Sequence, residues 1–468
     1  MRDIPRQSAF AAESSDIIAA SSRLTVPPRP FPALSLMLDP RLAERAAGFG
    51  PSTATPEPRA ARERAETAVK WAAVLLGFSI PVSVVLDNVL LGLILLFWIA
   101  GGRYREKLAV VRGNPVALLA LALYVLHLLG ALYSIGPSKD VLDALVKASR
   151  LLLIPALIFL LREPVWRERG IAAFLASMLV TLVLSYLLWL GVLSGNGWLK
   201  GVAFDPVVFK AHITHNVFMA FAALLFAQAA LDASTRTGRI VLAALCAAVV
   251  ANVLLMVPGR TGIVVLVVLF VYFLCRGLRL KGLALAGAVL GVLAVVVLAS
   301  PESMLHKRIT LADEEYQQWR SGVPPAPTSS VGLRLELLRN TLGIIGDHPV
   351  LGVGTGGFGQ AYADRVGDPG AGGTHNPHNE ILLMVAQFGV AGFVLLAGLL
   401  ATQWRLAARL PGRFEPVAAR ALVLTFAVAS ALTSTLIDHS EGFLFAYMSG
   451  LLFAGYPVHG AQPRVDAT

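Results

Sequence analysis

A short polar segment, Thr374-His375-Asn376-Pro377-His378-Asn379-Glu380, stands immediately before a long apolar run. Its two histidines lie three positions apart, beside amide and carboxylate side chains. Because the ordinary pKa of histidine is about 6.5, either ring could act as a general base near neutral pH. The other interpretations are a polar helix start capped by Asn376 or Asn379, and a zinc site that lacks a clear third ligand. The segment is a candidate catalytic centre.

Two arginines occupy positions that suit an anionic ligand. Arg260 stands in a very short turn between two apolar runs, where a charge at the bilayer edge is costly unless it reaches water or binds an anion. Arg334 stands in 332–346, whose leucines recur at helical spacing, and alone it would be an ordinary solvated residue paired with Glu336 or Glu380. Two guanidinium groups together could hold a pyrophosphate by bidentate hydrogen bonds.

Other motifs carry less chemistry. The glycine run 352–359 lacks the Gly-Lys-Ser/Thr ending and the βαβ context of a nucleotide-binding loop. We expect it to be a flexible turn whose backbone approaches a bulky substrate. Asp438-His439-Ser440-Glu441 could line the same cavity, although a polar turn that caps two helices explains it better. No Asp-x-Asp occurs, so the sequence gives no support for a metal-bound nucleotide-sugar site.

The elements that must position these residues are membrane helices. Of the 468 residues, 56% are hydrophobic and 15% are charged, whereas soluble domains carry roughly 25% charged residues. The net charge of +10 therefore indicates loops beside anionic lipid rather than a nucleic-acid-binding surface. Cys246 and Cys275 both lie in apolar runs, which argues against a disulfide framework or a cysteine zinc site. We predict an all-α integral membrane protein.

A spanning helix needs about 20 mostly apolar residues. Twelve segments are candidates: 68–84, 87–102, 114–134, 145–161, 171–193, 213–231, 239–257, 261–276, 282–300, 380–403, 417–437 and 441–457. The first two are short and interrupted by Pro81 and Asp87, so they could form a tilted or re-entrant pair. No internal repeat is evident, which weakens an interpretation as an inverted-repeat transporter.

Lysine and arginine are distributed unequally between the two ends of these segments. With the N-terminus inside, sixteen fall in the inner loops and six in the short outer connections, namely Lys139, Lys147, Arg150, Lys200, Lys210 and Arg260. The positive-inside rule therefore places both termini in the cytoplasm.

This orientation divides the chain into five regions. Residues 1–66, dominated by Ala, Pro, Ser and Arg, are predicted to be a disordered cytoplasmic tail. The others are nine spans in 67–300, a large outer loop at 301–379 with an amphipathic helix at 332–346, three spans in 380–457, and a cytoplasmic tail at 458–468.

Several short motifs follow one another in a characteristic order. They are Arg260-Thr261-Gly262, Gly332-Leu333-Arg334, Asp347-His348-Pro349-Val350-Leu351-Gly352-Val353-Gly354, and His378-Asn379-Glu380-Ile381-Leu382 leading into Phe388-Gly389-Val390-Ala391-Gly392. The ordered set resembles the O-antigen ligase (WaaL-type) family of the ligase and polymerase superfamily. The layout of about 12 transmembrane helices with one large periplasmic loop extends the resemblance to most of the chain.

The resemblance implies a membrane glycosyltransferase of GT-C-like architecture. Such enzymes move a glycan from undecaprenyl diphosphate to lipid A–core oligosaccharide at the periplasmic face of the inner membrane, in lipopolysaccharide biosynthesis. The family's essential loop histidine falls on His378, with the extra His375 as the other candidate for the base, and its two essential arginines fall on Arg260 and Arg334. The substrate-binding residues that we expect besides these are His375, Asn379, Arg150, Lys210 and His215.

The expected reaction is an inverting transfer in which arginines replace a metal ion, so we expect neither a metal nor another cofactor. The expected partners are the lipid-linked glycan donor, the lipid A–core acceptor and membrane lipids, with no nucleic acid; the sequence does not indicate an oligomeric state.

Three alternatives compete with this interpretation. An O-antigen polymerase would use the same donor with a second lipid-linked glycan as acceptor. A transporter or flippase of lipid-linked glycans would hold charged groups at the membrane midplane, whereas here arginine and histidine gather at the outer edge. A ten-span cell-wall glycan polymerase fits less well, because its span count and loop motifs differ.

Overall fold

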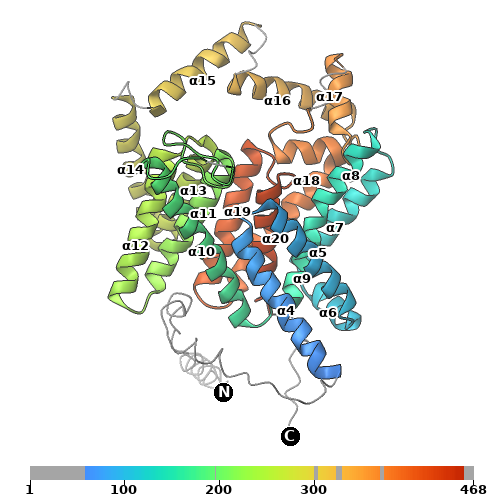
Figure 1. The fold of residues 1–468 in the computed structure, drawn as a ribbon. Coiled ribbons are helices and arrows are strands. Elements are labelled where there is room, and N and C mark those ends of the chain that lie inside the picture. Colours follow the sequence, from blue (N-terminus) through green and yellow to red (C-terminus); the bar gives the residue numbers. More distant parts are fainter. Residues whose placement is uncertain (1–57, 196, 300–303, 323–328, 369–373, 458–468) are drawn as a thin grey trace, which may run out of the picture.

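The computed structural model describes residues 58–195, 197–299, 304–322, 329–368 and 374–457, and these residues form a helical bundle without a β-strand (Figure 1). The first half of the bundle consists of α4 (Pro58–Ser79), α5 (Val84–Ala100), α6 (Tyr104–Gly113), α7 (Pro115–Ala131), α8 (Ser138–Ala148), η1 (Ser149–Leu152), α9 (Leu153–Leu160), α10 (Pro164–Trp189) and α11 (His212–Asp232). The second half consists of α12 (Arg236–Ala251), η2 (Asn252–Met256), α13 (Arg260–Leu278), α14 (Leu280–Leu298), α15 (Met304–Arg320), α16 (Ser330–Asp347), α17 (Phe358–Val366), α18 (Glu380–Leu406), η4 (Ala407–Arg409), α19 (Phe414–Leu432) and α20 (His439–Phe453).

Each of the twelve segments predicted to span the membrane overlaps a helix of this bundle. Among the described residues, six helical stretches are long and apolar enough to cross a bilayer: α10, α11, α12 with η2, α13, α18 with η4, and α19. The pair α5 and α6 passes the same test together but is bent by 115°, and α7 and part of α14 are shorter apolar helices. The chain is therefore a multi-pass membrane protein, while the number twelve stays a prediction.

The predicted disordered tail 1–66 is wrong for residues 58–66, which form the first turns of α4. Pro58 stands at the helix start, where its fixed φ is favourable, and the alanine, arginine and glutamate residues that follow are strong helix formers. Glu66 then meets Lys70 one turn later at 3.4 Å between Oε1 and Nζ. Residues 1–57 and the predicted tail 458–468 lie outside the described residues.

The most buried span is α11, which packs against α12, α13 and α19. Its interior side chains include Phe218 and Phe221, both in contact with Phe174 of α10. Because α11 sits among these helices, a polar side chain on it can hold the ends of its neighbours in place.

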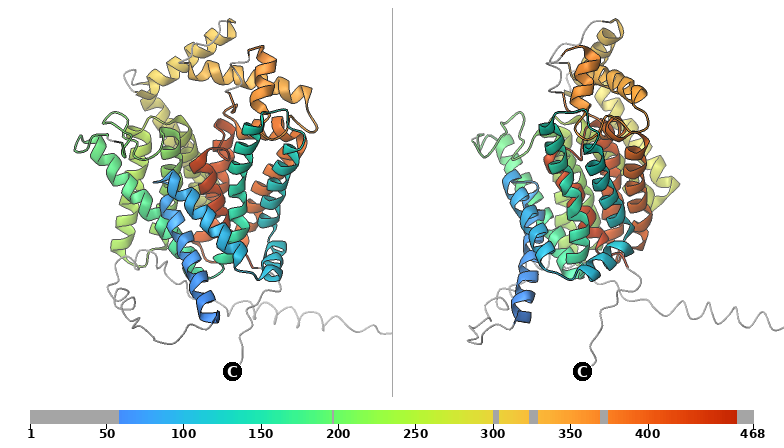
Figure 2. Two further views of the ribbon diagram at one scale, coloured as in Figure 1. Left: turned by 45° about the vertical axis from the view of Figure 1, so that its right-hand side comes forward. Right: turned by 90° about the vertical axis from the view of Figure 1, so that its right-hand side faces the viewer.

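The loop helices α15, α16 and α17 lie over one end of the bundle, and α8 is at the same end (Figures 1 and 2). The short helix α6, which carries the arginine-rich segment 103–112, lies at the opposite end (Figure 1). The predicted amphipathic helix 332–346 falls within α16. The loop helices and α6 thus lie at opposite ends of the bundle, while the orientation of the chain in the membrane stays a prediction.

The glycine run 352–359 packs on the bundle, so its expected role as a flexible turn facing substrate is wrong. A side chain at Gly354, where φ is +82°, would lie 2.4 Å from the Ser134 Cα atom. A break in α18 at Gly389, where φ is +58°, accompanies this contact. The amides of Val353 and Gly354 donate to the carbonyls of Ala386 and Gln387 just before that break, at 2.9 Å each. These bonds hold the segment between α16 and α17 against α18.

The predicted orientation can be tested with single cysteines on exposed positions at the two ends of the bundle. Ser321 follows α15 and Ala408 lies in η4, and both residues are exposed. We expect Ser321→Cys to react with an impermeant thiol reagent in intact spheroplasts and Ala408→Cys to react only after the membrane is permeabilised. The neighbouring Ala407 is unsuitable because it is fully buried. The reverse labelling pattern would invert the orientation.

Candidate active site

Arg260 is held at the first position of α13 by contacts of the preceding turn with α11. The Asn216 side-chain amide donates to the Val257 carbonyl at 3.0 Å and to the Gly259 carbonyl at 3.3 Å. A Cβ atom at Gly259 would lie 2.4 Å from Asn216 Nδ2, so glycine is needed for this close approach. The exposed Arg260 side chain therefore projects from a turn whose backbone is fixed on both sides.

The turn follows a π-helical segment, η2, at the end of α12. Asn252 in this segment donates to Ser185 Oγ at 2.8 Å, and its Oδ1 lies 3.0 Å from His215 Nε2. π-Helical turns inside α-helices often occur at functional sites. His215, which we expected to bind substrate, is only 3% exposed and serves this buried network.

His378 is held in an unusual backbone conformation at the end of the outer loop. Its φ is +53°, in the left-handed region that few residues other than glycine adopt. Its backbone amide donates to Asn376 Oδ1 at 2.7 Å, and that oxygen also accepts a hydrogen bond from Ser434 Oγ. Strained backbone of this kind persists only where the surroundings enforce it, and it is frequent at active sites. The His378 side chain is exposed.

Asn379 caps α18, as one of the two interpretations of the sequence proposed. Its Oδ1 accepts from the Leu382 amide at 3.0 Å, and its Nδ2 donates to the Ala431 carbonyl at 3.0 Å. The next residue, Glu380, is fully buried and accepts from the Leu436 amide at 3.0 Å. Asn379 thus ties the start of α18 to the last turn of α19, and Glu380 ties it to the turn between α19 and α20. Both contacts support the neighbouring His378.

The structure brings Arg260, Arg334 and His378 together, although they come from α13, α16 and the segment before α18. Arg334 is partly buried, and its pKa is lowered first by loss of solvent and then by the charge of Arg260. The pKa of His378 is lowered first by loss of solvent and then by the charge of Arg334. Within the described part of the chain, neither arginine forms an ion pair. Like charges held together without a carboxylate are suited to receive an anion.

The second histidine of the segment, His375, lies in a different environment. Its Nδ1 is 3.7 Å from Asp140 Oδ2 on α8, and its side chain is 52% exposed. A carboxylate beside His375 and an arginine beside His378 distinguish the two rings. Glu336, proposed as a partner for Arg334, instead accepts hydrogen bonds from Trp319 at 3.3 Å and Asn340 at 3.0 Å.

Arg150 and Lys210 face a different, buried set of charges. Lys210 Nζ lies 4.0 Å from Oδ2 of Asp87, a fully buried carboxylate on α5. His439 approaches the same oxygen at 3.8 Å, while Arg150 donates to the Asp438 carbonyl at 2.9 Å. Arg150 and Lys210 are each 7% exposed. Lys210 and Arg150 therefore face acceptors inside the bundle, and not His378.

A segment of the chain is similar in sequence to a known protein family. Residues 245–397 match the family described as O-antigen ligase, and they include Arg260, Arg334 and His378. These residues are called the O-antigen ligase domain below, after the family that they match. No curated protein matches the chain. The match does not distinguish a ligase from a polymerase.

Sequence reasoning missed how two asparagines, Asn216 and Asn376, hold the site in place. Asn216 stands outside the matched segment, on α11, yet it fixes the turn that carries Arg260. Asn376 does the same for the His378 backbone. The signal that could have revealed Asn216 is an amide inside an apolar span, where an unsatisfied polar group is costly and a hydrogen-bond partner is expected.

We expect Asn216→Ala to reduce transfer by acting through Arg260. Loss of the amide leaves two buried carbonyls without their donor, at a cost of about 1–3 kcal/mol, and releases the turn. Initial rates measured in the Arg260→Ala background should then change little when Asn216→Ala is added. Full additivity of the two substitutions would show that Asn216 stabilises the protein without positioning Arg260.

Proposed function

We propose that this protein transfers a glycan from undecaprenyl diphosphate to lipid A–core oligosaccharide at the periplasmic face of the inner membrane. The observation that carries the proposal is that Arg334, on the loop helix α16, lies close enough to both Arg260 and His378 for its charge to interact with theirs. The O-antigen ligase domain that contains all three residues supports the same class of reaction.

The two arginines are proposed to hold the diphosphate of the donor. Guanidinium groups bind phosphate oxygens in a bidentate way and keep their charge, so they favour the extra negative charge that develops on the leaving oxygen. Arg334 and Arg260 come from different elements, which allows them to contact different oxygens of one diphosphate. Substrate binding would also relieve the repulsion between the two cations.

His378 is proposed to act as the general base. Its neutral ring takes the proton of the acceptor hydroxyl while that oxygen attacks C1 of the donor sugar. The new C1–O bond forms as the bond from C1 to the diphosphate oxygen breaks, so undecaprenyl diphosphate leaves and the anomeric centre inverts. The lowered pKa of His378 keeps the ring neutral at physiological pH, ready to accept the proton.

Because two arginines supply the positive charge at the diphosphate, the proposed mechanism uses no divalent cation. We expect the purified protein to transfer glycan from a lipid-linked donor at an unchanged initial rate in excess EDTA. If EDTA abolishes turnover and added Mg²⁺ or Mn²⁺ restores it, this mechanism is wrong. His375, His378 and Glu380 would then be the candidate metal ligands.

An O-antigen polymerase is the second candidate, because it suits the same domain. Deletion of the gene followed by electrophoresis of lipopolysaccharide separates the two functions. A ligase mutant loses all glycan on lipid A–core, whereas a polymerase mutant retains a single repeat unit. A mutant that accumulates donor on the cytoplasmic side would instead indicate a transporter. Complementation with the wild-type gene must restore the original pattern.

A further inference from the structure

The loop between α10 and α11, described at 190–195 and 197–211, carries large apolar side chains that face away from the protein. Trp198 is 84% exposed and Phe204 is 81% exposed, and the smaller Val192 and Val202 are exposed as well. The proposed reaction uses none of these residues. Contiguous exposed apolar side chains mark a surface that another molecule or a membrane covers.

Phe204 stands at the tip of a tight turn with a defined backbone. Val202 and Asp205 exchange two backbone hydrogen bonds, at 3.1 and 3.0 Å between nitrogen and oxygen. Further from the tip, the Lys200 amide donates to the Val208 carbonyl at 2.9 Å. The turn therefore holds the Phe204 ring at its end, where the rest of the protein does not cover it.

The base of this turn is packed against the bundle. Ser185 Oγ on α10 donates to the Pro206 carbonyl at 2.7 Å, in a buried position. Val207 is buried in one cluster with Val257, which belongs to the turn that carries Arg260. Because its base is packed and hydrogen-bonded, the loop presents its aromatic rings as part of a folded structure.

The loop continues the membrane-facing surface of the span α10. Val183 on this span is 50% exposed, and Leu190, two turns further on and therefore on the same face, is 62% exposed. Figure 2 shows the loop projecting sideways from the bundle, level with the ends of the spans and beneath the loop helices. Trp189, at the end of α10, is also exposed. Tryptophan is enriched at this depth, where a ring meets both acyl chains and headgroups.

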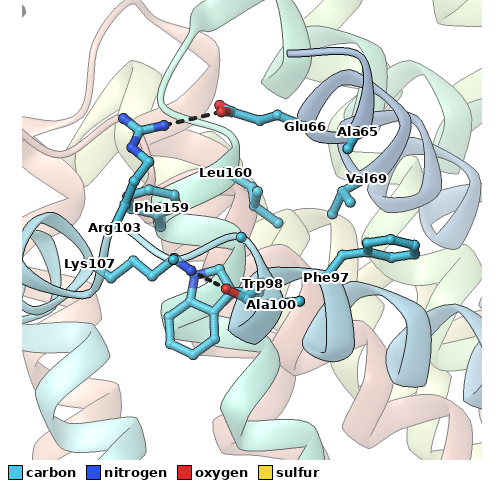
Figure 3. A pocket seen from close by; sticks show the side chains of 12 residues that line it. Ala65, Glu66, Val69, Phe97, Trp98, Ala100, Arg103, Lys107, Phe159 and Leu160 are labelled. Carbon is cyan, nitrogen blue, oxygen red and sulfur yellow. Dashed lines mark hydrogen bonds and ion pairs between the residues drawn. The ribbon is translucent and has the colours of Figure 1, made fainter. Parts of the chain in front are cut away.

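The opposite end of the bundle holds a cavity of about 510 Å³ beside α4, α5 and α9, whose charged side chains have partners within the protein (Figure 3). Arg103 pairs with Glu66 at 3.1 Å and with Glu106 at 2.6 Å. Lys107 donates to the Trp98 carbonyl, as Figure 3 shows. The lining of this cavity therefore does not select a ligand by charge, and the loop between α10 and α11 is the better candidate for an interaction surface.

From these observations we propose that the loop between α10 and α11 inserts Trp198 and Phe204 into the headgroup region of the adjacent leaflet, which the predicted orientation makes the outer one. The rings would lie between headgroups and the first acyl carbons, as aromatic residues do at membrane interfaces. The exposed Lys200 would reach lipid phosphates while its stem lies along the apolar surface. Aromatic rings also stack on sugars, but the aliphatic side chains exposed beside them, Val192 and Val202, suit lipid better than sugar.

The depth of the loop can be measured by spin labelling of the full-length protein in liposomes of phosphatidylethanolamine and phosphatidylglycerol, with Cys246 and Cys275 replaced by alanine. A nitroxide at Ala203→Cys, an exposed position next to Phe204, leaves both aromatic rings in place. We expect this label to collide readily with oxygen, which dissolves in the bilayer, and rarely with a water-soluble nickel chelate present on both sides. A label at Ser321→Cys, which follows α15, is the control and should show the reverse.

Phe204→Asp tests the contribution of the ring itself. A carboxylate at the tip disfavours insertion into lipid, so the Ala203 label should lose its shielding from the nickel chelate and behave like the Ser321 label. Leu311→Asp is the matched control, because Leu311 is also an exposed apolar residue but lies on α15, and it should leave the Ala203 label unchanged. Trp198→Ser is the second variant if Phe204→Asp does not fold, and its expected effect has the same direction.

Two results would overturn the proposal: equal collision rates with the nickel chelate at the Ala203 and Ser321 labels, or unchanged shielding of the Ala203 label in both Phe204→Asp and Trp198→Ser. A third is an Ala203 label that becomes shielded only when lipid-free core oligosaccharide is added, because a glycan and not the membrane would then cover the rings. None of these measurements requires glycan transfer, so their outcome is independent of the proposed function.

Discussion

Replacement of His378 by alanine is expected to lower the turnover number for glycan transfer by about 10²–10⁴-fold, the usual contribution of a general base. Binding of the lipid-linked donor should be nearly unchanged, because proton abstraction contributes mainly in the transition state. Single-turnover rates and equilibrium binding of the donor would separate the two effects. Because His378 has a left-handed backbone conformation, circular dichroism and gel filtration of the variant are needed to establish that it is folded.

His375→Ala is the matched control, since this ring lies three residues earlier on the same loop and faces Asp140 at 3.7 Å. We expect it to retain most of the activity. If His375→Ala abolishes transfer while His378→Ala retains it, the base has been assigned to the wrong histidine. The argument for the two arginines would still stand, because it rests on their own positions.

The apolar helices and the multi-pass membrane character could be predicted because long apolar runs depend only on local sequence. Every predicted span overlaps a helix, and the predicted helix 332–346 lies within α16. The start of α4 was missed because an Arg- and Ala-rich stretch of high charge suits both a tail and a helix. The ion pair of Glu66 with Arg103 joins this stretch to a segment 37 residues away, which no local pattern reveals. The bend at Gly389 depends on contacts with the Val350 carbonyl, which no local pattern reveals.

The candidate site was only partly predictable for a similar reason. Arg260, Arg334 and His378 belong to recognisable motifs, but their proximity depends on how α13, α16 and α18 pack. Arg150 and Lys210 were expected to bind substrate because they are cations on outer connections. Their internal partners, Asp87 and the Asp438 carbonyl, are distant in sequence and could not be inferred. A cation on an outer connection can bind substrate or form a buried contact inside the protein. Only the fold distinguishes these two roles.

Arg334→Gln should be as damaging as loss of the base, but in a different way. A guanidinium that contacts the diphosphate acts on the bound donor and on the growing negative charge. Both donor affinity and turnover should therefore fall, with turnover reduced by about 10²–10³-fold, as when one donor of an oxyanion site is removed. Arg334→Lys should rescue only part of this loss, because lysine lacks the bidentate fork. The exposed Arg339 on the same helix supplies the control Arg339→Gln, which should behave like the wild type.

The pH dependence of Arg334→Gln tests the proximity of Arg334 to His378 independently of substrate binding. In the wild type, loss of solvent and, second to it, the charge of Arg334 lower the pKa of His378, so the base stays neutral, and active, further into acid than an ordinary histidine would. Without that charge the pKa of His378 rises toward its usual value, and protonation disables the base at a higher pH. The acid limb of kcat/KM, which reports the free enzyme, should therefore move to higher pH in Arg334→Gln and stay in place in Arg339→Gln. An unchanged acid limb in Arg334→Gln would mean that Arg334 and His378 do not interact in the working protein, whatever the loss in rate.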